Sequence, residues 1–227
     1  MATPDQQELR EQFKLLGQTS NMPIHFTGDT INTLVIGEEH WRFSVPEAKL
    51  IRWIEPSKVL LEGLTGFVYD PKQAKLLTQP KSWCDPNEQD IIWQALTSDP
   101  AIDPTSLLPF KEVSDELGIP IIGCDITLIE MWQKAIVKYG EPEESIMRLL
   151  TPGNEIEFLR LTDTRTRVFR DRFIGRYIKK HQGIPTKPTV AIVGHAHAKY
   201  MHDAKILDNY CFFELVSSQG LGNVVKL

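Results

Sequence analysis

Short apolar runs alternate along the chain with longer stretches that are apolar on one helical face only. Residues 33–36 and 58–61 are rich in β-branched and other apolar side chains and are bounded by turn residues, which predicts short buried strands. Between them, Ser44, Pro46 and Glu47 form a helix-start signal: a serine cap, an early proline and a glutamate three residues after the serine. This order predicts two parallel strands joined by a crossover helix.

The rest of the chain continues the alternation and predicts a single α/β domain with a mainly parallel central sheet flanked by helices. Further strands are expected at residues 119–123, 189–193 and 210–216, and further helices at residues 3–16, 85–96, 111–117, 127–139, 143–150 and 154–180. Residues 18–32 are expected to form a loop, and residues 65–110 a proline-rich insertion with one clear helix. A chain of 227 residues that is 41% hydrophobic suffices for one well-buried core and is short for two.

Ionisable side chains follow three of the predicted strands. The pattern glycine-x-x-histidine occurs twice, as Gly-Glu-Glu-His at 37–40 and Gly-His-Ala-His at 194–197. A lone histidine after a strand is more often structural, but histidine and glutamate together supply general bases and metal ligands. The carboxyl ends of parallel strands meet at one edge of a sheet, where open α/β sheets bind ligands. Four side chains are therefore expected to converge in one cleft: Glu38, His40, Glu62 and His197.

The arginines of the helix expected at 154–180 differ in the face they occupy. Arg170 falls on the stripe of apolar residues that lie three, four and seven positions later, whereas Arg172 and Arg176 fall on the polar stripe. An arginine that faces a core needs an anionic partner, so Arg170 is a candidate site residue, with a structural salt bridge as the alternative. Asp125, just past a strand, could hold a metal or a loop, but a helix cap formed by Asp125 or Thr127 is favoured.

Four segments of the chain, taken together and in this order, resemble one known superfamily. They are V-I-G-E-E-H, L-L-E-G-L, R-D-R-F-I and V-A-I-V-G-H-A-H, and the resemblance extends over most of the chain from about residue 31 to 200. The chain is similar to the superfamily that groups the TraB, TIKI, ChaN and erythromycin esterase proteins. It departs from that pattern in two places: His195 is an extra histidine, and residues 123–128 only loosely match TraB's aspartate–arginine segment because they lack its arginine.

The resemblance implies a pocket at the strand ends but several chemistries. TIKI-like members are metal-dependent peptidases, the esterases hydrolyse a lactone apparently without metal, ChaN-like members bind haem, and some toxin and effector domains share the fold. The leading prediction is a hydrolase of peptide or ester bonds that acts on a small molecule, a peptide or a protein. A non-catalytic module that binds haem, a metal or a peptide, and a toxin-type effector, stay open as alternatives.

Each candidate residue has an expected role in the hydrolase. His40 acts as the general base, and Glu38 or Glu62 orients its imidazole or binds a metal. His197 and Arg170 stabilise the developing oxyanion.

A metal ion would change these roles, and the spacing does not decide whether one is bound. A divalent ion would take His40, His197 and Glu62 as its three protein ligands, with one position left open. Haem is the less favoured cofactor, and His195 is a further candidate for contacting a cofactor. His25 and His202, both expected in loops, are weaker candidates for reaching the pocket.

Composition and charge limit the partners. A net charge of −5 gives no general attraction to nucleic acid or to anionic membranes. The three cysteines lack a C-x-x-C spacing, which fits a reducing compartment, and no apolar run approaches the ~20 residues of a membrane span. The chain also lacks the glycine-rich nucleotide-binding motifs and the G-x-S-x-G motif of serine hydrolases. We therefore expect a cytoplasmic protein, or an effector exported without a classical signal peptide, that binds neither nucleic acid nor membrane.

Overall fold

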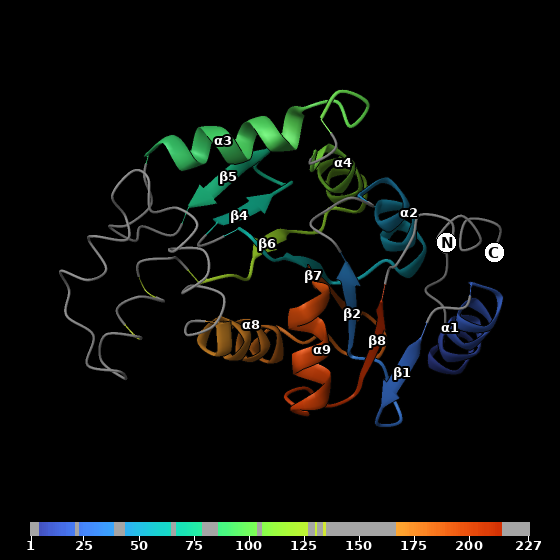
Figure 1. Cartoon of the computed structure of the whole chain (residues 1–227). Coiled ribbons are helices and arrows are strands. Elements are labelled where there is room, and N and C mark those ends of the chain that lie inside the picture. Colours follow the sequence, from blue (N-terminus) through green and yellow to red (C-terminus); the bar gives the residue numbers. More distant parts are fainter. Residues whose placement is uncertain are drawn as a thin grey trace.

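A computed structural model of the chain describes residues 5–20, 23–38, 44–64, 67–78, 86–103, 106–126, 130, 134 and 167–214. These residues form one α/β domain around an eight-stranded, mostly parallel sheet with helices on both faces (Figure 1). The order of the strands across the sheet is β1-β8-β2-β7-β3-β6-β4-β5. The predicted fold class is confirmed.

The strands and helices have the following bounds. The strands are β1 (Ile24–Thr27), β2 (Thr33–Glu38), β3 (Lys58–Leu61), β4 (Phe67–Asp70), β5 (Lys75–Thr78), β6 (Ile121–Gly123), β7 (Thr189–Gly194) and β8 (Tyr210–Glu214). The helices of the described ranges are α1 (Gln6–Ser20), α2 (Ser44–Ile54), α3 (Pro86–Thr97), α4 (Leu108–Leu117), α8 (Arg167–Lys180) and α9 (His195–Asp203). Strands β8, β2, β7, β3 and β6 are parallel neighbours, whereas β1 at one edge and the β4–β5 hairpin at the other pair antiparallel.

Strand β7 lies at the centre of the sheet, between β2 and β3. It pairs in parallel with both, so that Ile192 lies opposite Ile36 of β2 and Leu61 of β3. The predicted β2–α2–β3 unit is therefore present, but its two strands are separated by a strand from much later in the chain. Central parallel strands are covered on both faces, which explains why all three are nearly continuous in apolar residues.

Side chains alternate along the strands and enter two separate cores. Leu34 and Ile36 of β2 join the core beneath α1, α2, α3 and α4, whereas Val35 joins the core beneath α8 and α9. Each such side chain is at most 1% exposed, and burying it contributes about 1.5–3 kcal/mol before entropy losses. Figure 1 shows α8 and α9 next to each other and apart from α2 and α4.

Two sequence expectations were wrong. The segment at 18–32 is not all loop, because α1 continues to Ser20 and β1 pairs with β8. The described part of the proline-rich insertion is not irregular throughout, because β4 and β5 extend the sheet beyond β6. β1 and β5 are short edge strands and β4 lies next to β5, and such outer strands lack the continuous apolar run that marks a central one.

Several other expectations concern residues that the structure does not describe. The helices expected at 127–139 and 143–150, the first part of the helix expected at 154–180, and the end of the last strand fall mostly or wholly outside the described ranges. Within those ranges, none of the helices has the length and apolar character needed to cross a membrane.

Candidate functional site

The candidate site lies where β3, β6 and β7 end, on the face of the sheet that α8 and α9 cover. Leu61 faces the core beneath α2, so Glu62, the next residue, faces α8. Its carboxylate accepts a hydrogen bond from the backbone N–H of Gly194 at the end of β7. A Cβ at Gly194 would lie 3.2 Å from Oε2 of Glu62 and 3.4 Å from Cδ2 of His197. Glycine at this position therefore allows the strand end to approach both side chains closely.

Arg170 on α8 links two buried carboxylates. Its Nη2 donates to Oε1 of Glu62 at 2.7 Å and to Oδ2 of Asp125 at 2.5 Å, and its Nε donates to Oδ1 of Asp125 at 3.0 Å. The side chains of Glu62 and Asp125 are 5% and 4% exposed, so the guanidinium compensates charges that water cannot reach. Burial alone would lower the pKa of Arg170, but the hydrogen bond to Asp125 and the charges of both carboxylates outweigh it and raise that pKa.

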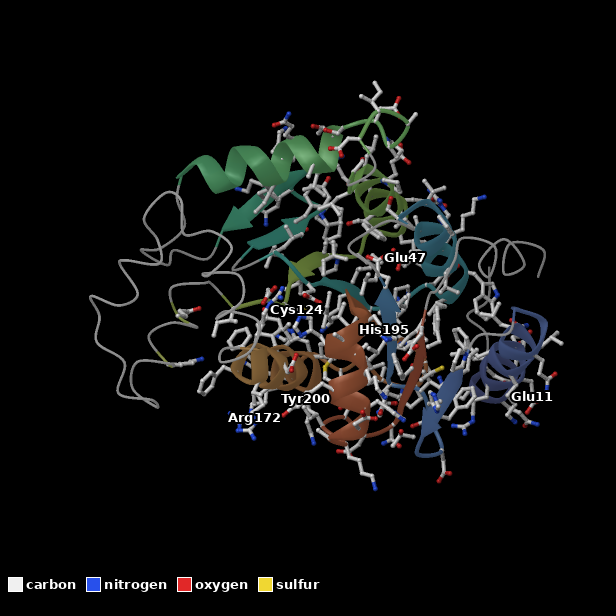
Figure 2. The ribbon with its side chains drawn as sticks, viewed as in Figure 1. Glu11, Glu47, Cys124, Arg172, His195 and Tyr200 are labelled. Carbon is white, nitrogen blue, oxygen red and sulfur yellow. The ribbon has the colours of Figure 1, made fainter. Side chains whose placement is uncertain are left out.

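The helical period separates Arg170 from its neighbours as predicted. Arg170 faces the sheet and is partly buried, whereas Arg172 and Arg176 are exposed. Figure 2 shows Arg172 pointing away from α8. Composition alone does not distinguish these arginines, but the position of each on the helix does.

Asp125 is a site residue that the sequence reasoning placed second to a helix cap. It follows β6, and besides Arg170 its carboxylate accepts the backbone N–H of Gly63 at 2.9 Å and of Ile126 at 2.7 Å. It thereby ties the turn after β3 to the end of β6 and to α8. An aspartate one residue past a strand is a common cap, so the only sequence signal for this role was an arginine that needed an acidic partner.

His197 on α9 is held between two carboxylates. Its Nδ1 bonds the Asp171 carboxylate, and its Nε2 lies 3.1 Å from Oε1 of Glu62. Burial alone would lower the pKa of His197, but the hydrogen bonds to Asp171 and Glu62 outweigh it and raise the pKa to about 9. Burial likewise would raise the pKa of Glu62, but His197, Arg170 and the Gly194 N–H together lower it. At neutral pH the pair is therefore imidazolium and carboxylate.

The Nε2 atom of His197 has a second neighbour, Nη1 of Arg170, at 3.1 Å. In the imidazolium, Nε2 carries a proton and donates it toward Glu62. In the neutral ring with the proton on Nδ1, the same Nε2 becomes an acceptor for the Arg170 N–H. Each protonation state of His197 thus has a partner in place, which suits a group that gives up a proton and takes it back.

Glu38 lies at the same edge of the sheet but on the opposite face. Gly37 of β2 faces Ala198 of α9. Because successive residues of a strand point to opposite faces of the sheet, Glu38 points toward α2 and its Glu47. Glu47 is labelled in Figure 2. Both glutamates are buried, and neither oxygen of the Glu47 carboxyl has a hydrogen-bond partner among the residues that the structure describes. Burial first, and then the charge of Glu38, raise the pKa of Glu47 well above its ordinary value. Glu38 therefore does not join the network of Glu62 and His197.

The remaining histidine candidates lie apart from this network or outside the described residues. His40 belongs to the undescribed residues 39–43, so its role stays a prediction. His195 is the first residue of α9, its side chain is 45% exposed, and its Nδ1 lies 3.4 Å from Oε2 of Glu214. His202 was expected in a loop near the pocket, but it lies in α9 and its ring contacts His25 instead.

The predicted metal site cannot be assembled from the described side chains alone, because His40 lies outside them. Within the ranges that the structure covers, no group of three or more His, Cys, Asp or Glu side chains is arranged to hold a metal. Nδ1 of His197 already bonds Asp171, and its Nε2 faces Glu62 together with the charged Arg170. The ligand set of His40, His197 and Glu62 stays a prediction because it depends on His40, and we derive no step through a metal.

No family model, no curated protein and no solved structure matches this chain. The resemblance to the superfamily of TraB, TIKI, ChaN and the erythromycin esterases therefore remains a prediction from four sequence segments. The function has to be argued from the geometry of the site.

Proposed function

We propose that this protein is a hydrolase of peptide or ester bonds that uses the network of Glu62, Arg170 and His197. One observation carries the proposal: His197 is buried at the strand ends, with Nδ1 held by Asp171 and Nε2 directed at two further charged groups. A carboxylate that holds one imidazole nitrogen and directs the other at the reacting atoms is a recurring arrangement in hydrolytic sites.

In this proposal His197 acts as a proton donor. With a pKa of about 9 its ring carries the proton at neutral pH, so Nε2–H can bond a developing oxyanion or protonate the leaving group. The substrate oxygen has to replace Glu62 as the partner of this N–H. Once the proton has been transferred, the neutral Nε2 accepts a hydrogen bond from Nη1 of Arg170, which stabilises the product state of the transfer.

The general base is a separate group. Glu62 suits that role poorly, because its lowered pKa makes it a weak proton acceptor. We assign the base to His40, as the sequence predicts: it takes a proton from water while the water oxygen attacks the carbonyl. We further propose a cytoplasmic protein, or an exported effector, that acts on a small molecule, a peptide or a protein.

A panel of aryl esters, lactones and fluorogenic peptides tests this function with purified protein. Replacing His197 with Gln should lower turnover by at least ~100-fold, the contribution expected of a general acid. His195→Gln is the matched control, because His195 lies two residues away on the same helix but is partly exposed and outside the network. Hydrolysis that His197→Gln leaves unchanged would refute the proposal.

A second candidate function is a binding module without turnover. The observation that favours it is that all the charged groups of the network already have partners among themselves. This candidate predicts no hydrolysis of any substrate on the panel, but a bound metal in elemental analysis or a haem band in the absorbance spectrum. A hydrolytic rate that depends on His197 would exclude it.

A further inference from the structure

A second cluster of histidines lies on the same face of the sheet, away from the Glu62 network. His25 on β1 and His202 on α9 have ring centroids 4.6 Å apart, with their planes inclined by 37°. Both rings lie against Phe212 of β8, at centroid distances of 5.8 Å and 5.4 Å. His202 is five residues beyond His197, which is about 7.5 Å along the helix. The proposed hydrolase has no use for this pair.

The environment of His202 suits a metal ligand. Its Nδ1 lies 2.8 Å from the hydroxyl oxygen of Tyr210, and this contact orients the ring. Nε2 is then the ring nitrogen that is left to bind a metal. Metal-binding histidines usually have their second nitrogen held in this way.

The separation of the rings fits two ligands of one ion. A metal about 2.0–2.1 Å from a ring nitrogen lies roughly 3.2 Å from the ring centroid. The centroids of two imidazole ligands are therefore about 4.5 Å apart when the two metal–nitrogen bonds meet at a right angle, as in tetragonal Cu²⁺ sites, and about 5.2 Å apart around a tetrahedral Zn²⁺ ion. The observed separation is 4.6 Å. Because the two rings come from a strand and a helix, their separation is set by the packing of α9 on the sheet.

We propose that His25 and His202 form a binding site for a divalent transition-metal ion that joins β1 to α9. The remaining coordination positions face water, because His25 is exposed on the edge strand. The charges near His202 include the carboxylates of Asp203 and Glu214 and the ammonium of Lys199. Imidazole ligands select Cu²⁺, Ni²⁺ and Zn²⁺ over Mg²⁺ and Ca²⁺, and Cu²⁺ binds more tightly than Zn²⁺ at such sites.

Titration of the full chain, free of any histidine tag, with Zn²⁺ and with Cu²⁺ tests this site. Calorimetry should give one Zn²⁺ per chain, and electron paramagnetic resonance of the Cu²⁺ form should show two imidazole nitrogens. His25→Gln and His202→Gln should each weaken Zn²⁺ binding by at least tenfold. Tyr210→Phe should weaken it by about tenfold, as the loss of an orienting partner does. His181→Gln, which removes a partly buried histidine elsewhere, should leave the affinity unchanged.

Thermal melts separate binding from folding. Zn²⁺ should raise the Tm of the wild type and of His181→Gln but not that of His25→Gln, whose exposed position leaves the metal-free Tm unchanged. Mg²⁺ should have no effect on any variant. The proposal is overturned if Zn²⁺ does not bind, if either His25→Gln or His202→Gln binds it as tightly as the wild type, or if the Cu²⁺ spectrum shows a single nitrogen. In that case the rings form only an aromatic stack against Phe212.

Discussion

The proton on His197 should make the stability of the fold depend on pH in a window that the structure defines. The ring has an ordinary pKa of 6.5 and a folded-state pKa of about 9. At ~1.36 kcal/mol for each pH unit, this difference corresponds to a stabilisation of ~3 kcal/mol when the ring is charged. Because the side chain is only 10% exposed, little of this is lost to screening by solvent.

The sign follows from which state binds more protons. Between pH 6.5 and about pH 9 the folded chain keeps the His197 proton and the unfolded chain loses it, so stability falls as pH rises. The full stabilisation is present below pH 6.5 and is lost as pH rises through about 9. Other groups also titrate, so the relevant quantity is the difference in unfolding free energy between the wild type and His197→Gln, which has no ionisable ring.

Urea unfolding of both proteins at a series of pH values measures this difference. It should shrink by ~3 kcal/mol between pH 6 and pH 10. An Asp171→Asn variant should move the loss to lower pH, because the first of the two carboxylates that hold the proton is gone. The reasoning fails if the difference is independent of pH, or if nuclear magnetic resonance places the His197 titration near 6.5 in the folded protein.

Three further predictions follow from the packing and the charges. Arg170→Lys keeps the charge but loses the planar guanidinium that bonds both Glu62 and Asp125. It should lower the unfolding free energy by about 1–3 kcal/mol in urea titrations and impair activity. Arg172→Lys, the control, should change the unfolding free energy by less than about 0.5 kcal/mol. Leu60→Ala, at a fully buried position of β3, should cost about 2–5 kcal/mol, and a cost below 1 kcal/mol would show that its core can collapse around the loss. Glu47→Gln should raise the Tm at neutral pH, and the rise should be smaller at pH 4. The raised pKa of Glu47 makes the wild type lose stability as pH rises above 4.5, and glutamine does not titrate. An equal loss of Tm at both pH values would show instead that the fold needs the Glu47 carboxyl group.

The features predicted from the sequence are those with a regular pattern of apolar residues, namely the central strands and the helix faces. The central strands are marked by continuous apolar runs, and the helical period alone placed Arg170 toward the sheet. The superfamily resemblance and the hydrolytic function remain untested predictions. Edge strands such as β1 were missed, because half-exposed strands carry no such run.

Side-chain partners depend on which face of the sheet a residue joins, and this was harder to predict. Glu38 and Glu62 both follow apolar strands, yet they point to opposite faces, because only the register of β2 and β3 with β7 decides the direction of the last side chain. Asp125 was expected to cap a helix, and Asp171 stands next to Arg170 in the chain. Their contacts with Arg170 and His197 cross between elements that no local pattern relates.

The position of β7 between β2 and β3 has a consequence for how the protein is made. A ribosome that has released only the first half of the chain has supplied β2 and β3 but neither Arg170 nor His197 nor the strand that separates them. The edges of β2 and β3 that later pair with β7 are then unpaired. The two strands have to remain apart, or separate again, until β7 is available. The strand that closes this gap also brings Gly194 to Glu62 and α9 to the site.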